Sequence, residues 1–226
     1  MNKRLTLGII VLLVAVISLF LLKYGKFLSG ITGYQIMPTR LVIIKQNASA
    51  CNMTFYEGWN FVSFPCLSTD AEVSFFLQNL SNYQSVRYYN PNDPTDPWKS
   101  YNPGLPSWAV QDLNRISRKG AYWITVQNTT RFYMAGLLAT PSLYDLVTGW
   151  NMIGYPSWIE QSINATFGQL IPNFDYIYIY NASDPSDQWK QYTWNSSLPS
   201  DQDLNDTQIY YGYWIFMNNP DTLVIN

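Results

Sequence analysis

The chain has 226 residues, a formal net charge of −2 and no histidine. Aromatic residues make up 17 % of it and charged residues only 12 %, which excludes a disordered chain and favours an aromatic-rich packed fold. Residues 141–226 carry nine acidic side chains against the single basic Lys190, and a surface of this sign repels phosphate, so we expect no nucleic-acid partner.

Residues 1–34 are predicted to form an N-terminal signal anchor and linker. Residues 5–22 run for eighteen positions without a charge, about the minimum for a transmembrane helix, and basic residues flank both ends. A cleaved signal peptide and a pilin-like leader cut near Gly8 are alternatives, but no Ala-x-Ala site follows and the pilin-like cut lacks its Glu. We therefore expect a single-pass protein of the cell membrane that contacts the bilayer through residues 5–22.

Asn-x-Ser/Thr sequons occur eight times after this segment and never before it. Their number indicates that the carboxyl-terminal part lies outside the cell and is glycosylated, although a chain rich in Asn, Ser and Thr also forms some sequons by chance. The sequon asparagines are Asn47, Asn52, Asn79, Asn128, Asn164, Asn181, Asn195 and Asn205.

Beyond a stalk or short strand at 35–50, the sequence repeats itself at a constant offset of 91 residues. Gly58-Trp59-Asn60 returns as Gly149-Trp150-Asn151, and residues 89–101 and 121–124 match 180–192 and 212–215. Matches this dispersed, without a change of register, indicate a tandem duplication. The predicted domains are therefore 51–140 and 141–226.

Each copy is predicted to be an α+β unit, a small antiparallel sheet with one helix. Residues 53–56 and 59–64 have the pattern of a hairpin, with Gly58 supplying the positive φ of the turn. A capping-box pattern at 69–72, followed by apolar residues at 73, 76, 77 and 80, predicts the helix, and residues 163–171 hold a similar stripe. Strands are expected at 86–89, 98–101, 121–126 and 132–134 and at their counterparts in the second copy.

The two cysteines flank the predicted hairpin. An antiparallel pairing centred on residues 58 and 59 would bring Cys51 opposite Cys66, and the equivalent positions of the second copy are Ser142 and Ser157, so both thiols are present together or absent together. We predict a disulfide, which an exterior compartment permits; two small buried thiols are the alternative.

The sequence offers few side chains that could carry out catalysis or bind a metal. Without histidine, and with both cysteines bridged, we expect no catalysis, no nucleophile of these types and no zinc site. Oxygen side chains in the two Asp-Pro-x-Asp loops could hold calcium as the one cofactor, while a rigid Asx/Pro turn is the alternative explanation. The candidate calcium ligands are Asn90, Asn92, Asp93 and Asp96 in the first loop and Asn181, Asp184 and Asp187 in the second.

The tryptophans fall into two groups. Those shared by both copies lie on predicted strands, where a core needs large side chains, although they could also form platforms that stack sugar rings. Trp108, Trp158 and Trp194 have no aromatic counterpart in the other copy and lie in loops. These three are therefore the better candidates for an exposed ligand contact.

The motif Gly-Trp-Asn, followed by Trp-x-x-Tyr and Gly/Ala-Tyr-Trp-Ile, resembles the GWN-type repeats of archaeal and bacterial cell-surface and secreted proteins. It is carried here by residues 58–65, 98–101 and 121–124, and again by 149–156, 189–192 and 212–215, and the segment ending at Tyr34 resembles the anchors of archaeal surface proteins. The resemblance implies an envelope role and no known catalytic residues. We expect a membrane-anchored extracellular protein acting in adhesion, envelope structure or protein interaction, and alternatively a carbohydrate-binding module or accessory domain of a surface enzyme.

Overall fold

The computed structural model describes residues 48–80, 82–106, 108–137, 141–198 and 202–226. Contacts divide the chain into residues 1–45 and 46–226, and everything below concerns the second part. The predicted anchor at 5–22, its linker and the sequon at Asn47 lie outside the described residues. Within the described ranges, no helix is long and apolar enough to cross a membrane.

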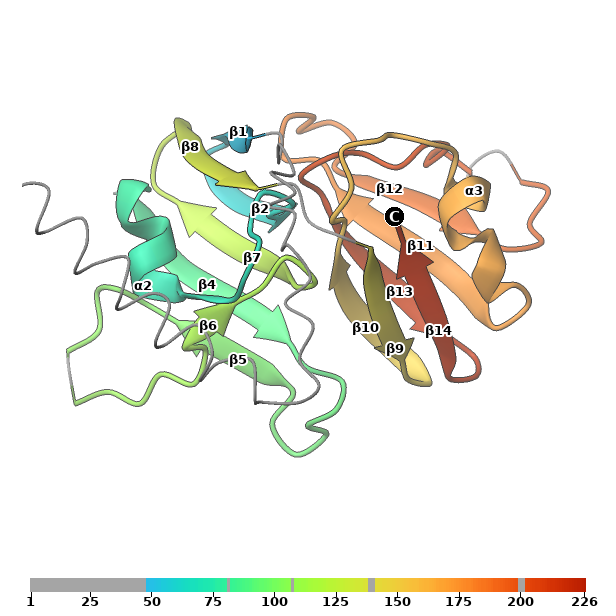
Figure 1. Ribbon diagram of the computed structural model, residues 1–226, viewed down its shortest axis with the longest axis horizontal. Coiled ribbons are helices and arrows are strands. Elements are labelled where there is room, and N and C mark those ends of the chain that lie inside the picture. The colour runs from blue at the N-terminus through green and yellow to red at the C-terminus, as the bar shows by residue number, and fades with distance from the viewer. Residues whose placement is uncertain (1–47, 81, 107, 138–140, 199–201) are drawn as a thin grey trace, which may run out of the picture. The chain divides into compact units, whose positions relative to one another are not determined.

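The first repeat combines a four-stranded sheet with a two-stranded ribbon (Figure 1). The sheet has the order β2-β7-β4-β5 and is antiparallel throughout. Its strands are β2 (Gly58–Ser63), β4 (Tyr83–Tyr89), β5 (Trp98–Tyr101) and β7 (Ala121–Val126). The ribbon pairs β1 (Ala48–Phe55) with β8 (Thr130–Leu137), and a short pair joins β3 (Ala71–Glu72) to β6 (Arg115–Ile116).

The second repeat has the same arrangement. Its sheet has the order β10-β13-β11-β12, and the ribbon pairs β9 with β14. These strands are β9 (Ser142–Leu146), β10 (Gly149–Gly154), β11 (Phe174–Tyr180), β12 (Trp189–Thr193), β13 (Gly212–Met217) and β14 (Asp221–Ile225). Each sheet strand begins 91 residues after its equivalent in the first repeat, so the offset in the sequence is also the offset between equivalent strands.

The core of each repeat lies between its sheet and its ribbon. Because side chains alternate along a strand, Tyr122, Ile124 and Val126 of β7 all point to one face and are buried there. Phe132 of the ribbon, completely buried, contacts the rings of Phe55, Phe64 and Phe76 in this core. The second repeat buries an equivalent set that includes Phe167, Phe174 and Tyr213. The small space between the two layers is thus filled by residues from one face of each sheet.

The α+β prediction is wrong, because the described residues are mostly β and hold only two short α-helices. The first is α2 (Val73–Phe76) with a 3₁₀ turn at Leu77–Asn79, and the second is α3 (Ile163–Phe167) with a 3₁₀ turn at Gly168–Leu170. The predicted capping box does not form, since Ala71 and Glu72 pair as a strand and Glu72 makes no side-chain cap. The predicted apolar stripe is nevertheless buried, because a single turn suffices to lay it on the core.

The predicted hairpin between residues 53–56 and 59–64 is also wrong. β1 pairs with β8 and β2 pairs with β7, so the turn after Phe55 carries the chain from the ribbon into the sheet. Gly58 has a φ of 88° and Gly149 has a φ of 90° at the equivalent turn, a conformation that favours glycine. β1 starts at Ala48, within residues 35–50, which were predicted to be a stalk or short strand.

Asn60 holds this turn together. Its Oδ1 accepts a hydrogen bond from the Tyr56 N–H at 2.8 Å, and its Nδ2 donates to the carbonyl oxygens of Tyr56 at 2.7 Å and Gly58 at 3.1 Å. Asn151 makes the same three bonds with Val147 and Gly149. The Gly-Trp-Asn motif is therefore a turn in which glycine provides the backbone angle and a buried asparagine satisfies the backbone groups.

The predicted disulfide between Cys51 and Cys66 is confirmed. The two cysteines are not opposite each other in a hairpin, as we had expected, because Cys51 lies on the ribbon strand β1 and Cys66 follows the sheet strand β2. The bond therefore ties the ribbon to the sheet of the first repeat across a sequence separation of 15 residues.

We expect the double substitution of Cys51 and Cys66 by serine to lower the free energy of unfolding by about 3 kcal/mol, because the bond restricts a loop of this length in the unfolded chain. Urea unfolding of both proteins under oxidising conditions measures the difference. Adding a reductant to the wild type should reproduce the loss and should leave the variant unchanged. Equal urea midpoints of the two oxidised proteins would contradict the prediction.

Candidate functional site

The two repeats pack through small residues at equivalent positions of their sheets. The Ser63 N–H donates to the Tyr210 carbonyl at 2.7 Å, and the Gly154 N–H donates to the Lys119 carbonyl at 2.8 Å. The two donors, Ser63 and Gly154, are 91 positions apart in the sequence, and so are the two acceptors, Lys119 and Tyr210. These two contacts are therefore reciprocal, which is the property of an interface with approximate two-fold symmetry.

Aromatic pairs around this interface obey the same symmetry. The ring centroids of Trp98 and Trp214 are 5.9 Å apart, and those of Trp123 and Trp189 are 5.7 Å apart. Tyr89 lies 5.1 Å from Trp214, and its equivalent Tyr180 lies 5.1 Å from Trp123. Of the shared tryptophans, Trp98, Trp123, Trp189 and Trp214 therefore join the two repeats.

A cleft of about 570 Å³ opens beside this interface, and we call it the aromatic cleft. The first repeat contributes most of its wall, and Tyr180 and Trp189 of the second repeat close one side. Three of its tryptophans are strongly exposed, Trp59 at 39 %, Trp98 at 45 % and Trp189 at 50 %. Its lining consists of Trp59, Arg87, Trp98, Lys99, Ser100, Trp123, Tyr180 and Trp189.

Strand alternation explains why these side chains share one face. Across the sheet, Phe61 of β2 lies opposite Trp123 of β7, Trp123 lies opposite Arg87 of β4, and Arg87 lies opposite Ser100 of β5. The rings of Phe61 and Trp123 stack at 4.6 Å. Val62, Ile124 and Val86, the neighbours of Phe61, Trp123 and Arg87 along their strands, are buried in the core, so this row lies on the opposite face of the sheet.

The structure does not bring together the three tryptophans predicted as ligand contacts. Trp108 is 83 % exposed in the loop after β5, near the exposed Leu105 and Val110. Trp158 is half-buried against the core of the first repeat and meets Tyr210 edge-on at 5.7 Å, while Trp194 is half-buried against Phe174. Their role in ligand contact stays a prediction.

The predicted calcium residues surround a lysine in each repeat. Lys99 Nζ lies 2.8 Å from Asp93, 3.1 Å from Asp96 and 3.9 Å from Asp112. Hydrogen bonds from Lys99 and then Thr95 hold the pKa of Asp93 below its ordinary value. The loop carboxylates thus face a cation of the protein itself.

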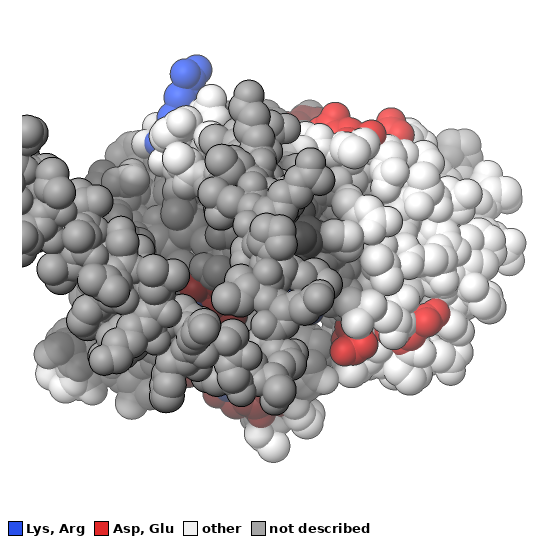
Figure 2. Space-filling model, viewed as in Figure 1, with Lys and Arg blue, Asp and Glu red and all other residues white. Residues whose placement is uncertain are grey.

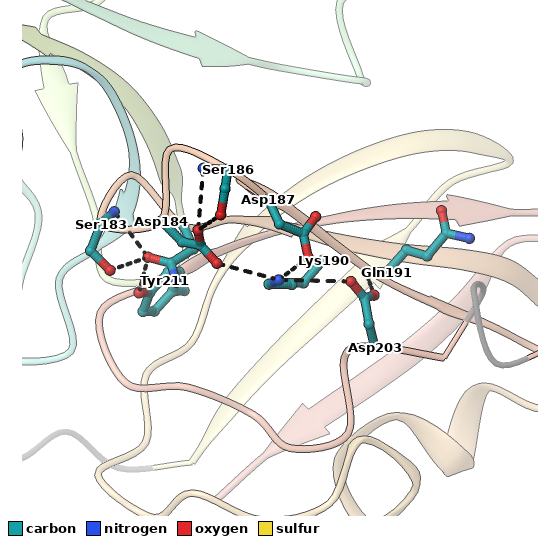
Figure 3. A network of polar contacts seen from close by, with 9 residues as sticks. Ser183, Asp184, Ser186, Asp187, Lys190, Gln191, Asp203 and Tyr211 are labelled. Carbon is teal, nitrogen blue, oxygen red and sulfur yellow. Dashed lines mark hydrogen bonds and ion pairs between the residues drawn. The ribbon is translucent and has the colours of Figure 1, made fainter.

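The second cluster repeats this arrangement around Lys190 (Figure 3). Lys190 pairs with Asp187 and lies 3.7 Å from Asp184 and 4.0 Å from Asp203. Asn90 and Asn181 use their side-chain oxygens inside their loops, accepting from the backbone N–H groups of Asn92 and Ser183. In the part of the chain that the structure describes, no group of three or more acidic, cysteine or histidine side chains could hold a metal ion. Calcium binding stays a prediction.

The described sequon asparagines lie mostly on the surface. Asn181 is half-buried, and its Oδ1 accepts a hydrogen bond from the Tyr211 hydroxyl at 3.0 Å. The exposed ones are Asn52, Asn79, Asn128, Asn164, Asn195 and Asn205. Their exposure is compatible with modification, and their glycosylation stays a prediction.

The site thus has the groups of a binding surface, with flat rings, one guanidinium and a hydroxyl, and the only two thiols of the sequence are joined in the disulfide. Sequence reasoning weighed the shared tryptophans mainly as core. The alternation of Tyr122, Ile124 and Val126 with Trp123 was the signal that places Trp123 on the other face.

Comparison with known proteins found no matching family model, curated protein or solved structure.

Proposed function

We propose that this chain is a membrane-tethered surface protein that binds carbohydrate in the aromatic cleft. The single observation that carries the proposal is the gathering of three exposed tryptophans around a cleft between two repeats. Exposed tryptophan is rare on a soluble surface unless it contacts a ligand or partner, because burial of a large ring is strongly favourable.

The chemistry of the cleft suits a sugar. A pyranose presents C–H groups on its flat faces and hydroxyl groups around its edge, so a tryptophan ring packs on the face while polar groups bind the edge. Ser100 and Arg87 supply polar groups next to the rings of Trp59, Trp98 and Trp189. A volume of about 570 Å³ lies in the range of small-molecule sites and admits a short oligosaccharide.

A location outside the cell supports the same proposal. The disulfide between Cys51 and Cys66 fits an oxidising compartment, since such bonds are rare in the cytosol. Residues 5–22 are the proposed tether. A glycan-binding protein held at the membrane would act in adhesion or in attachment of envelope polymers, and the proposal assigns it no catalysis.

The full-length protein in detergent micelles, applied to a glycan array and then to titrations with the best binder, tests the proposal. We expect Trp98→Ala and Trp189→Ala each to weaken binding about 10- to 100-fold, the effect of losing about 1–3 kcal/mol of ring stacking. Both side chains also pack on the other repeat, Trp98 on Trp214 and Trp189 on Trp123, so thermal melting is measured beside binding to show that each variant is folded at the titration temperature.

Trp108→Ala is the matched control, because it removes an exposed tryptophan that does not line the cleft. It should bind glycan like the wild type. An array without any specific binder, or equal losses in Trp108→Ala and Trp98→Ala, would refute carbohydrate binding in the cleft.

A further inference from the structure

We propose that the aromatic cleft selects carbohydrates that carry a carboxylate, and that Arg87 is the residue that recognises it. This inference rests on the proposed function and names its ligand class. Arg87 lies exposed on β4, and its guanidinium carbon is 5.2 Å from the centroid of the Trp59 ring. A cation–π contact with the ring takes up none of the guanidinium N–H groups, so they stay available for an acceptor.

Among the residues that the structure describes, Arg87 has no acidic partner. None of the hydrogen bonds or ion pairs between described residues involves its side chain, whereas Lys99 and Lys190 are each surrounded by three aspartates. An arginine beside an aromatic wall, with unused donors in a fork, matches the two oxygens of a carboxylate. A uronic acid offers this group on the same ring that stacks on tryptophan.

The second repeat shows that the guanidinium is not required by the fold. Its residue equivalent to Arg87 is Tyr178, whose ring lies 6.0 Å from Trp150. Ser85 and Thr125, which hydrogen-bond to each other at 2.8 Å, are replaced by Tyr176 and Phe216, whose rings are 6.2 Å apart. The same sheet face is therefore covered by rings in the second repeat and carries a cation and hydroxyls in the first.

Nearby charge acts against an anion, which makes the contact with Arg87 decisive. Lys99 lines the cleft with its own cluster of Asp93, Asp96 and Asp112, which is negative as a whole. Figure 2 also shows scattered acidic side chains over the second repeat on the face in view. Such repulsion is screened over about 8 Å at physiological salt, while a bidentate pair at contact distance is screened much less. Without Arg87 an acidic sugar should therefore have no advantage over a neutral one.

The test uses the full-length protein in detergent micelles and a panel of oligosaccharides of uronic acids, each matched to its methyl ester and to the corresponding neutral hexose oligomer. We expect the acid form of the best binder to bind at least about 10-fold more tightly than its ester, the size of one charge-assisted hydrogen bond. Arg87→Gln should remove this preference, and Arg87→Lys should restore part of it.

Arg131→Gln is the charge-matched control, since Arg131 is an exposed arginine on β8 away from the cleft lining, and it should keep the preference. Equal binding of acid and ester, or a preference for a neutral sugar, would overturn the inference and leave carbohydrate binding standing. Binding of no panel member and no array glycan would overturn both. Loss of binding to all members in Trp98→Ala, with the preference lost only in Arg87→Gln, would support both.

Discussion

Replacing Gly154 by alanine is expected to destabilise the protein by about 3 kcal/mol or more, the upper range for overpacking a close contact. A Cβ at this position would lie 2.5 Å from the carbonyl oxygens of both Arg118 and Gly120 in the first repeat. These atoms belong to the backbone, and the Gly154 N–H must stay 2.8 Å from the Lys119 carbonyl between them. The methyl group therefore has to push the two repeats apart at this contact.

Urea unfolding gives the loss directly, and glycan titration gives a second measurement. Because this interface also sets Trp189 against Trp123 across the aromatic cleft, the variant should bind glycan more weakly even where it remains folded. Gly104→Ala is the control, since its nearest atom is the Asn102 side-chain oxygen at 3.3 Å in an exposed turn, and its effect should stay within about 0.5 kcal/mol. Unfolding midpoints that shift equally in both variants would refute the role of close packing at Gly154.

The strands of the sheets could be predicted because their signals are local. The 91-residue offset aligned the two copies, and the apolar runs 121–126 and 213–217 were correctly predicted to be buried strands. The predicted pairing of 86–89 with 98–101 was confirmed. It could be predicted because the two strands are adjacent in the sequence and a loop rich in Asp, Asn and Pro joins them.

The partner of β1 could not be predicted from local pattern. Its neighbour in the sequence is β2, but its hydrogen bonds go to β8, where Phe55 faces Thr130 and Ala48 faces Leu137. Gly58 signals a turn without telling whether the chain returns in the same sheet or crosses to another layer. The disulfide was predicted correctly from the joint absence of cysteine in the second copy, while the geometric argument failed because it assumed the local hairpin.

The aromatic cleft was missed because ring size was taken as a sign of the core. Each core is small and is already filled by phenylalanines such as Phe64 and Phe132. Trp59 and Trp123 therefore lie on the other face of the sheet, and only the packing of one repeat on the other decides which of them is covered. The cleft is lined by residues of both repeats, so the sequence of one repeat alone does not predict it.

Replacing Asn60 by alanine is expected to lower the free energy of unfolding by about 3 kcal/mol, because it removes three hydrogen bonds that contribute about 1 kcal/mol each. Asn60 is only 2 % exposed, and the substitution removes the partners of the Tyr56 N–H and of the Tyr56 and Gly58 carbonyls. Asn151→Ala should cause a loss of similar size in the second repeat, since Asn151 makes the equivalent bonds. Urea unfolding measures both.

Asn60→Asp separates hydrogen bonding from packing, since the side chain keeps its shape. A carboxylate there would face two carbonyl oxygens, so we expect the introduced group to have a raised pKa in the folded protein. The variant should therefore be least stable at neutral pH and should regain stability relative to the wild type as the pH falls through that pKa. Asn92→Ala, at an exposed asparagine of the first Asp-Pro loop, should have little effect. A stability difference for Asn60→Asp that does not change with pH would contradict the assigned bonds.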